Sequence, residues 1–137
     1  MMNKQLIKVL FSLVIVIAIV SCNKGKEITF YVTNNSEFTK ENIIQVYLND
    51  TMLINQNFKY SDIVPNDEVF KFRLKKSFGR VRVVELTYGI EKIDSIDIDK
   101  DRYIFIGFNE FKKNLPPGDT VKREISILKR KKYTKLY

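Results

Sequence analysis

Histidine and tryptophan are absent from this chain of 137 residues, which contains one cysteine, three prolines and five glycines. Without histidine, the chain lacks the side chain that most often acts as a general base near neutral pH. A single cysteine cannot close an intramolecular disulfide, so packing alone must hold the fold. Neither a phosphate-cradling glycine loop nor a zinc-ligand spacing occurs. We therefore expect a protein that is not an enzyme and that holds no metal.

Long apolar runs are missing as well. The longest largely apolar stretch, from Val9 to Val20, covers about 12 residues and follows Lys4 and Lys8. A helix that spans a bilayer needs roughly 18–20 apolar residues, whereas the core of a signal peptide needs only about 7–15. The stretch therefore predicts a cleaved signal peptide rather than an uncleaved anchor helix.

The lone cysteine closes this segment, because Ile19, Val20 and Ser21 stand directly before Cys22. Together with the basic start and the apolar core, residues 1–22 resemble the signal peptide and lipobox of a bacterial lipoprotein. The resemblance implies that Cys22 carries a diacylglycerol on its sulfur and an acyl chain on its amino group. Two or more acyl chains give stable attachment to a membrane. No further cofactor is expected.

The charge is concentrated near the C-terminus. Residues 22–110 hold 13 basic and 14 acidic side chains, whereas residues 111–137 hold nine basic and two acidic ones.

The residue after the cysteine bears on localisation. Asn23 is not the aspartate associated with retention of lipoproteins in the inner membrane. We therefore expect the protein in the outer membrane, on the side that faces the periplasm rather than the cell surface. The predicted organisation is a signal peptide at 1–21, a tether at 22–26, a β-sandwich domain at 27–128 and a basic tail at 129–137.

Apolar residues alternate with polar ones along most of the remaining chain, as in Ile28, Phe30 and Val32. Turn-forming residues separate these runs, and Asn49-Asp50 predicts a tight hairpin. Alternation fails at Val83-Val84, which predicts a bulge or a strand buried on both faces. Residues 55–66 look irregular. We expect an all-β fold, a single β-sandwich of about seven or eight antiparallel strands of immunoglobulin-like or transthyretin-like type. The predicted strands are 28–33, 44–48, 52–54, 69–74, 81–86, 90–98, 103–108 and 121–128.

The basic residues near the C-terminus form a candidate contact surface. Anionic lipid headgroups attract each such residue by about 1 kcal/mol near a membrane. Glycans and acidic envelope proteins are alternative partners, and a frayed solubilising tail is the structural alternative. Nucleic acid is not expected, because an exported lipoprotein rarely meets it. The residues of this surface are Lys129, Arg130, Lys131, Lys132 and Lys135.

A cluster of aspartates comprises Asp94, Asp97, Asp99 and Asp101. The last three match the first ligand positions of a calcium-binding loop, but the turn glycine and the bidentate glutamate of that loop are missing. Aspartate is also a common turn former. The pattern favours a strand end and turn.

Three Asp-Ser/Thr-aliphatic motifs are similar to the O-glycosylation motif of one large group of Gram-negative bacteria. They make Thr51, Ser95 and Thr120 candidate modification sites. The same dipeptides are ordinary turn chemistry. Alternation also places Tyr31 and Tyr47 on outward strand faces, where they could contact a glycan or protein or simply pair across strands.

These observations predict a lipid-anchored cell-envelope lipoprotein that works as a non-enzymatic binding module or accessory subunit. The alternative is an immunity-type or inhibitor lipoprotein that blocks an envelope-directed toxin or enzyme. A hydrolase that uses paired carboxylates is the least favoured hypothesis, because about 116 residues with few loops offer little cleft.

Overall fold

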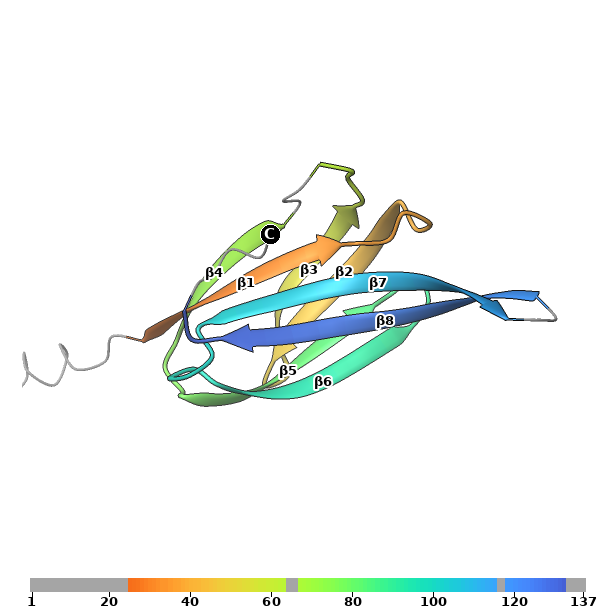
Figure 1. The fold of residues 1–137 in the computed structure, drawn as a ribbon. Helices are drawn as coiled ribbons and strands as arrows, with labels where there is room; N and C mark the ends of the chain where they lie inside the picture. The colour runs from red at the N-terminus through yellow and green to blue at the C-terminus, as the bar shows by residue number, and fades with distance from the viewer. Residues whose placement is uncertain (1–24, 64–66, 116–117, 133–137) are drawn as a thin grey trace, which may run out of the picture.

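The computed structural model describes residues 25–63, 67–115 and 118–132, with the backbone alone at 113–115 and 118–119 (Figure 1). The predicted signal peptide, the lipobox and Cys22 lie outside the described residues. Within the described ranges the chain forms strands and turns only, and no helix with the length and hydropathy of a membrane span is found.

Eight strands make up the fold, as predicted. Most are rich in Ile, Val, Phe and Tyr, which suit a pleated, half-buried surface. They are β1 (Lys26–Asn34), β2 (Glu41–Leu48), β3 (Thr51–Lys59), β4 (Glu68–Leu74), β5 (Phe78–Glu85), β6 (Ile90–Asp97), β7 (Tyr103–Leu115) and β8 (Gly118–Arg130).

The strands form two four-stranded sheets that pack face to face, in the orders β4-β1-β7-β8 and β3-β2-β5-β6. Five of the strand pairings are antiparallel, and the pairing of β1 with β7 is parallel. The predicted β-sandwich is confirmed, with this one departure from an all-antiparallel arrangement. The immunoglobulin arrangement joins strands one, two, five and four in one sheet. The observed order differs from it.

Alternate residues of the central strands fill the space between the sheets. Ile28, Phe30 and Val32 of β1 are buried, as the alternation predicted. Val46 of β2 and Ile106 of β7 are buried in the same way from the other strands. The full set of buried apolar residues is Ile28, Phe30, Val32, Ile44, Val46, Leu48, Ile54, Phe58, Val81, Val83, Ile96, Ile98, Ile104, Ile106, Phe108 and Ile125.

The hairpin at Asn49-Asp50 is confirmed, and both residues have positive φ, 48° and 68°. Two such residues in succession give a type I′ turn, whose twist matches that of the flanking strands.

Two local predictions were wrong. β5 has no bulge at Val83-Val84, because both residues pair in continuous register with β2 and β6. Nor is it buried on both faces, since Val83 is buried while Val84 is only half-buried. Glu85 occupies the next inward position, so the alternation is regular once a buried carboxylate is allowed. Residues 55–59, predicted irregular, belong to the edge strand β3.

β7 and β8 extend beyond the rest of the sandwich. β1 pairs with β7 only as far as Phe108, and from there β7 and β8 pair only with each other. Figure 1 shows this two-stranded ribbon projecting from the end opposite the start of β1. At its other end β8 continues to Arg130, two residues into the predicted tail.

Candidate functional site

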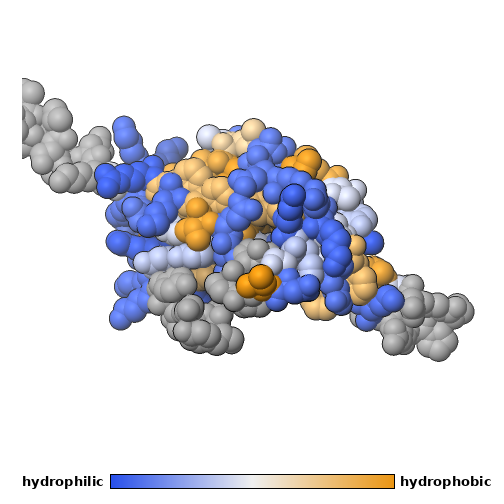
Figure 2. All heavy atoms as spheres, turned by 90° about the horizontal axis from the view of Figure 1, so that it is seen from above, coloured by the Kyte–Doolittle hydropathy of each residue, from blue (hydrophilic) through white to orange (hydrophobic). Residues whose placement is uncertain are grey.

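The sandwich has two ends that differ in charge. One end contains the start of β1, the end of β8 and the turns at 49–50, 75–77 and 98–102. We call it the tether end, because the segment predicted to be a tether precedes β1. The far end contains the loop at 35–40, the turn at 86–89 and the projecting ribbon. Basic side chains outnumber carboxylates among the described residues of the tether end. Figure 2 shows hydrophilic residues gathered at the end where β1 begins.

Three carboxylates at the tether end have a basic partner. These ion pairs are Lys26–Asp99, Arg80–Asp50 at 3.5 Å and Lys100–Asp97 at 3.6 Å. The hydrogen bond and positive charge of Lys26 lower the pKa of Asp99. The positive charge that remains belongs to six side chains with no ion pair in the described part of the chain, namely Lys75, Lys76, Arg102, Arg130, Lys131 and Lys132.

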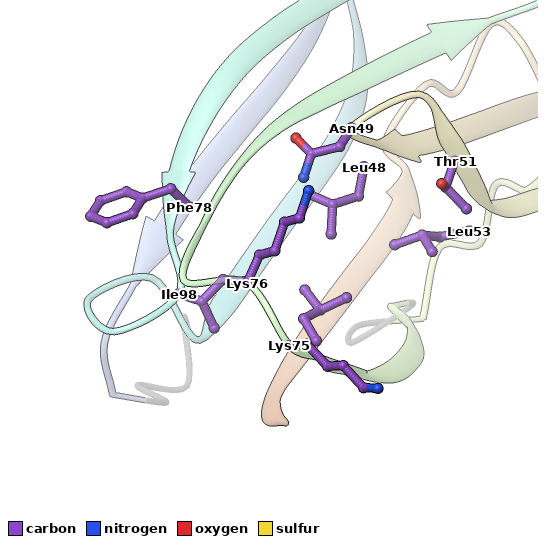
Figure 3. Close-up of a pocket in the computed structure, with 9 residues that line it drawn as sticks. Leu48, Asn49, Thr51, Leu53, Lys75, Lys76, Phe78 and Ile98 are labelled. Carbon is purple, nitrogen blue, oxygen red and sulfur yellow. The ribbon is translucent and has the colours of Figure 1, made fainter. Parts of the chain in front are cut away.

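A hollow of about 290 Å³ opens at the tether end, between the turns at 49–50 and 75–77 (Figure 3). Its walls are mostly apolar, and two lysines stand at its rim. Its lining residues are Leu48, Asn49, Thr51, Leu53, Leu74, Lys75, Lys76, Phe78 and Ile98.

The far end of the core is closed differently, by a layer of buried polar side chains. Each of the four central strands places one polar residue at the inward position that follows its apolar residues towards the far end. These residues are Asn34 of β1, Asn42 of β2, Glu85 of β5 and Glu110 of β7. We call this set the polar layer.

Glu110 is the most connected member of the polar layer, and its side chain is 0% exposed. Its carboxylate accepts hydrogen bonds from the hydroxyl of Ser36, from the backbone and hydroxyl of Thr39, and from Arg123 Nε at 2.6 Å. Burial acts to raise the pKa of Glu110, but these hydrogen bonds and the charge of Arg123 outweigh it and lower the pKa. The Arg123 guanidinium also lies 3.8 Å from the centre of the Tyr88 ring.

Two other members hold loops in place. Glu85 accepts hydrogen bonds from the backbone N–H groups of Thr87 and Tyr88, both at 2.9 Å. Asn34 donates to the backbone carbonyls of Thr39 and Phe58 and accepts from the N–H of Ser36. Such bonds make the layer a structural clamp on the far-end loops, because every carboxylate oxygen in it already has a donor.

Asn42 is the exception in the polar layer. Its side chain is 2% exposed, and neither its amide nitrogen nor its carbonyl oxygen has a hydrogen-bond partner among the residues that the structure describes. It pairs in register with Phe58, and both side chains face the core. A buried amide without partners destabilises a fold.

The predicted contact residues separate in the structure. Lys129 lies in β8, where its Nζ is 3.1 Å from Asp94 and donates to the Ser95 carbonyl at 2.9 Å. It thus joins the edges of the two sheets and is not available to a partner. Arg130, Lys131 and Lys132 lie at the tether end, and Lys135 falls outside the described residues.

The predicted aspartate cluster is used for turns and ion pairs. Asp97 accepts from the N–H of Asp99, and Asp101 accepts from the N–H of Asp97, both at 3.0 Å. Among the described residues no group of three or more ligating side chains is arranged to hold a metal. The three candidate glycosylation sites, Thr51, Ser95 and Thr120, are all exposed.

The two tyrosines face outward as predicted, but from opposite sheets. Tyr31 stacks on Phe105 at 4.7 Å between ring centres. The Tyr47 ring lies 4.0 Å from the Arg82 guanidinium, and its hydroxyl donates to Gln45. Both residues make cross-strand or same-face contacts and do not form one joint surface.

Sequence reasoning missed the hollow and the polar layer. The layer had a usable signal, because Asn34 and Glu110 continue the two-residue period of the apolar positions before them. The hollow had none, since its residues come from three separate segments. No protein-family model matches the chain, and a search of curated proteins finds no relative.

Proposed function

We propose that the protein is a lipid-anchored, non-enzymatic module of the cell envelope whose tether end faces an anionic membrane surface. The observation that carries this is the group of six basic side chains at the end of the sandwich where β1 begins, none of which forms an ion pair with another described residue.

The short segment between Cys22 and β1 supports the proposed orientation. A lipid on Cys22 would lie four residues before the start of β1, and four extended residues reach at most about 14 Å. Exposed charges act over a Debye length of roughly 8–10 Å at physiological salt. The anchor would therefore hold the tether end close enough for its charge to act on the headgroups. Each basic residue near such a surface contributes about 1 kcal/mol.

The opposite end would then face away from the membrane. It presents the projecting ribbon, with Phe111 48% exposed on β7 and Phe38 47% exposed on the neighbouring loop. Lys112 lies over the Phe38 ring, with 5.6 Å between its Nζ and the ring centre. Aromatic residues are enriched at protein contact surfaces. The accessory or binding role is assigned to this end.

Two experiments test the proposal. Cys22→Ser should move the protein from the membrane to the soluble fraction and abolish uptake of radiolabelled palmitate; unchanged fractionation and labelling would refute the anchor. For the orientation, the unlipidated chain is sedimented with vesicles of phosphatidylethanolamine, with or without phosphatidylglycerol.

Replacement of Lys131 and Lys132 by Glu should weaken binding to the anionic vesicles at least about tenfold. The matched control, Lys92→Glu with Lys122→Glu, makes the same change of charge towards the far end and should bind like the parent. Equal loss in both variants would show that only net charge matters and would refute the orientation.

A second candidate function, inhibition of an envelope-directed toxin or enzyme, is favoured by the shape of the ribbon. A narrow two-stranded projection with an exposed aromatic residue can enter a cleft that a flat sheet cannot. Phe38→Ser with Phe111→Ser should then abolish co-purification of a soluble enzyme and restore its activity. Capture of membrane proteins alone, unaffected by these substitutions, would contradict inhibition.

A further inference from the structure

The hollow at the tether end exists because the core is left open there. Leu48 and Ile98 are buried core residues at the ends of β2 and β6, and both reach the wall of the hollow. At the far end the corresponding positions are covered by the polar layer. At the tether end no such layer is present in the described residues, and the half-buried Leu53 and Leu74 extend the apolar wall towards solvent.

The rim of the hollow carries positive charge without a counter-charge. Lys75 and Lys76 follow β4, are exposed, and have no ion pair within the described ranges. Figure 3 shows the Lys76 side chain lying along the hollow towards Asn49, while Lys75 points away from it. Phe78, 69% exposed, stands at the edge with its ring turned outward. An apolar wall beneath the Lys76 ammonium, with the charge of Lys75 nearby, is complementary to a molecule with an apolar tail and an anionic head.

Size narrows the class of ligand. Small-molecule pockets commonly measure about 300–1,000 Å³, and this hollow of about 290 Å³ is at the lower limit. Part of one acyl chain fits such a space, whereas two chains of a phospholipid do not. We propose that the hollow binds a single-chain anionic lipid, with the chain against Leu53 and Leu74 and the head against Lys76. The proposal rests on the proposed function in one respect, because the nearby bilayer would supply the lipid.

The test uses the unlipidated chain with free amphiphiles, so it does not depend on anchoring. The core residues all lie between Ile28 and Ile125, so removal of the lipid leaves the core intact. Laurate and dodecyl phosphate carry the same chain with a carboxylate or a phosphate head, and monolaurin carries that chain with no charge. Binding is followed by two-dimensional NMR, and we expect both anions to shift the amide signals of Thr51, Leu53 and Ile98.

Two substitutions separate the roles of charge and wall. Lys75→Gln with Lys76→Gln should weaken binding of both anions at least about tenfold, because the charge-assisted contact of Lys76 and the longer-range attraction of Lys75 are lost. Leu53→Gln should abolish binding of all three probes, and Lys92→Gln should leave it unchanged. The unfolding midpoint of each variant confirms that it is folded.

Three outcomes would overturn the proposal: no shift at the hollow, equal affinity for monolaurin and the anions, or unchanged binding in the double lysine variant. A stronger response to one anion assigns the head as a carboxylate or a phosphate. If the NMR experiment showed no lipid binding at the hollow, the conclusion from the vesicle experiment with the Lys131 and Lys132 variant would still hold. Failure of the vesicle experiment alone would refute the membrane orientation and leave the hollow as a lipid site.

Discussion

Replacing the buried Asn42 by leucine should stabilise the protein. The amide is 2% exposed, and neither of its polar atoms has a partner. Leucine branches at the same carbon and has a similar shape, so it should occupy the same space beside Phe58, which is 1% exposed. Most substitutions in a core destabilise a protein, so a gain in stability would be diagnostic.

The magnitude follows from the two unpaired groups. A buried donor or acceptor without a partner costs about 1–3 kcal/mol, and that penalty disappears with the amide. Burial of two methyl groups adds a favourable term, which imperfect packing offsets in part. We therefore expect the free energy of unfolding to rise by about 1–3 kcal/mol, with the melting temperature rising by about 4 °C or more.

Urea denaturation followed by circular dichroism measures this change. The midpoint should move to higher urea with an unchanged slope, because the surface exposed on unfolding stays the same. The matched control is Asn55→Leu, since Asn55 is exposed on the edge strand β3 and should change stability by no more than about 0.5 kcal/mol. A loss of 1 kcal/mol or so in Asn42→Leu would show that the amide makes a stabilising hydrogen bond and would refute the reasoning.

Three further predictions concern the polar layer, the hairpin and the sheet face. Because the pKa of Glu110 is lowered in the folded state, its stabilising effect is present above the ordinary value of 4.5 and is lost as the pH falls through the folded pKa. Glu110→Gln should therefore remove this acid-side loss of stability and cost about 2 kcal/mol at pH 7, measured by urea midpoints across pH. Asp50→Gly should raise the free energy of unfolding by at most about 1 kcal/mol, because φ at this position is 68° and glycine adopts such a φ without strain. A lower thermal midpoint in this variant would contradict the prediction. Gly107→Ala should lower the free energy of unfolding by about 1 kcal/mol, because its Cβ would lie 2.8 Å from the Asn35 amide nitrogen and 2.9 Å from the Ser126 hydroxyl. Adding Ser126→Ala should recover part of the loss in the thermal midpoint, because it removes one of these two contacts.

The strands that pack one face on the core were predictable, because their apolar residues repeat every two positions. Ile28, Phe30 and Val32 illustrate this, and the turn at Asn49-Asp50 follows from two residues that tolerate positive φ. Edge strand β3 was harder to predict, because its middle residues Gln56 and Asn57 face solvent. Glu85 misled the prediction, since a carboxylate in a core position looks like a break in the pattern.

Which distant strands pair with each other could not be predicted from the sequence. Nothing local to β1 indicates that β7, rather than a hairpin neighbour, lies beside it in parallel. The tether end depends on that pairing, because it brings Tyr103 level with Thr29 and thus the turn at 98–102 level with the start of β1. The hollow depends likewise on the packing of turns that are far apart in the chain.

The central position of β1 bears on mechanical load. Tension applied through an N-terminal anchor would enter the fold at Lys26, in a strand hydrogen-bonded on one side to β4 and on the other to β7. Extraction of that strand requires both ladders to shear together along their length, whereas an edge strand can be peeled away one bond at a time. A pulling force applied through such an anchor would therefore meet high resistance at β1.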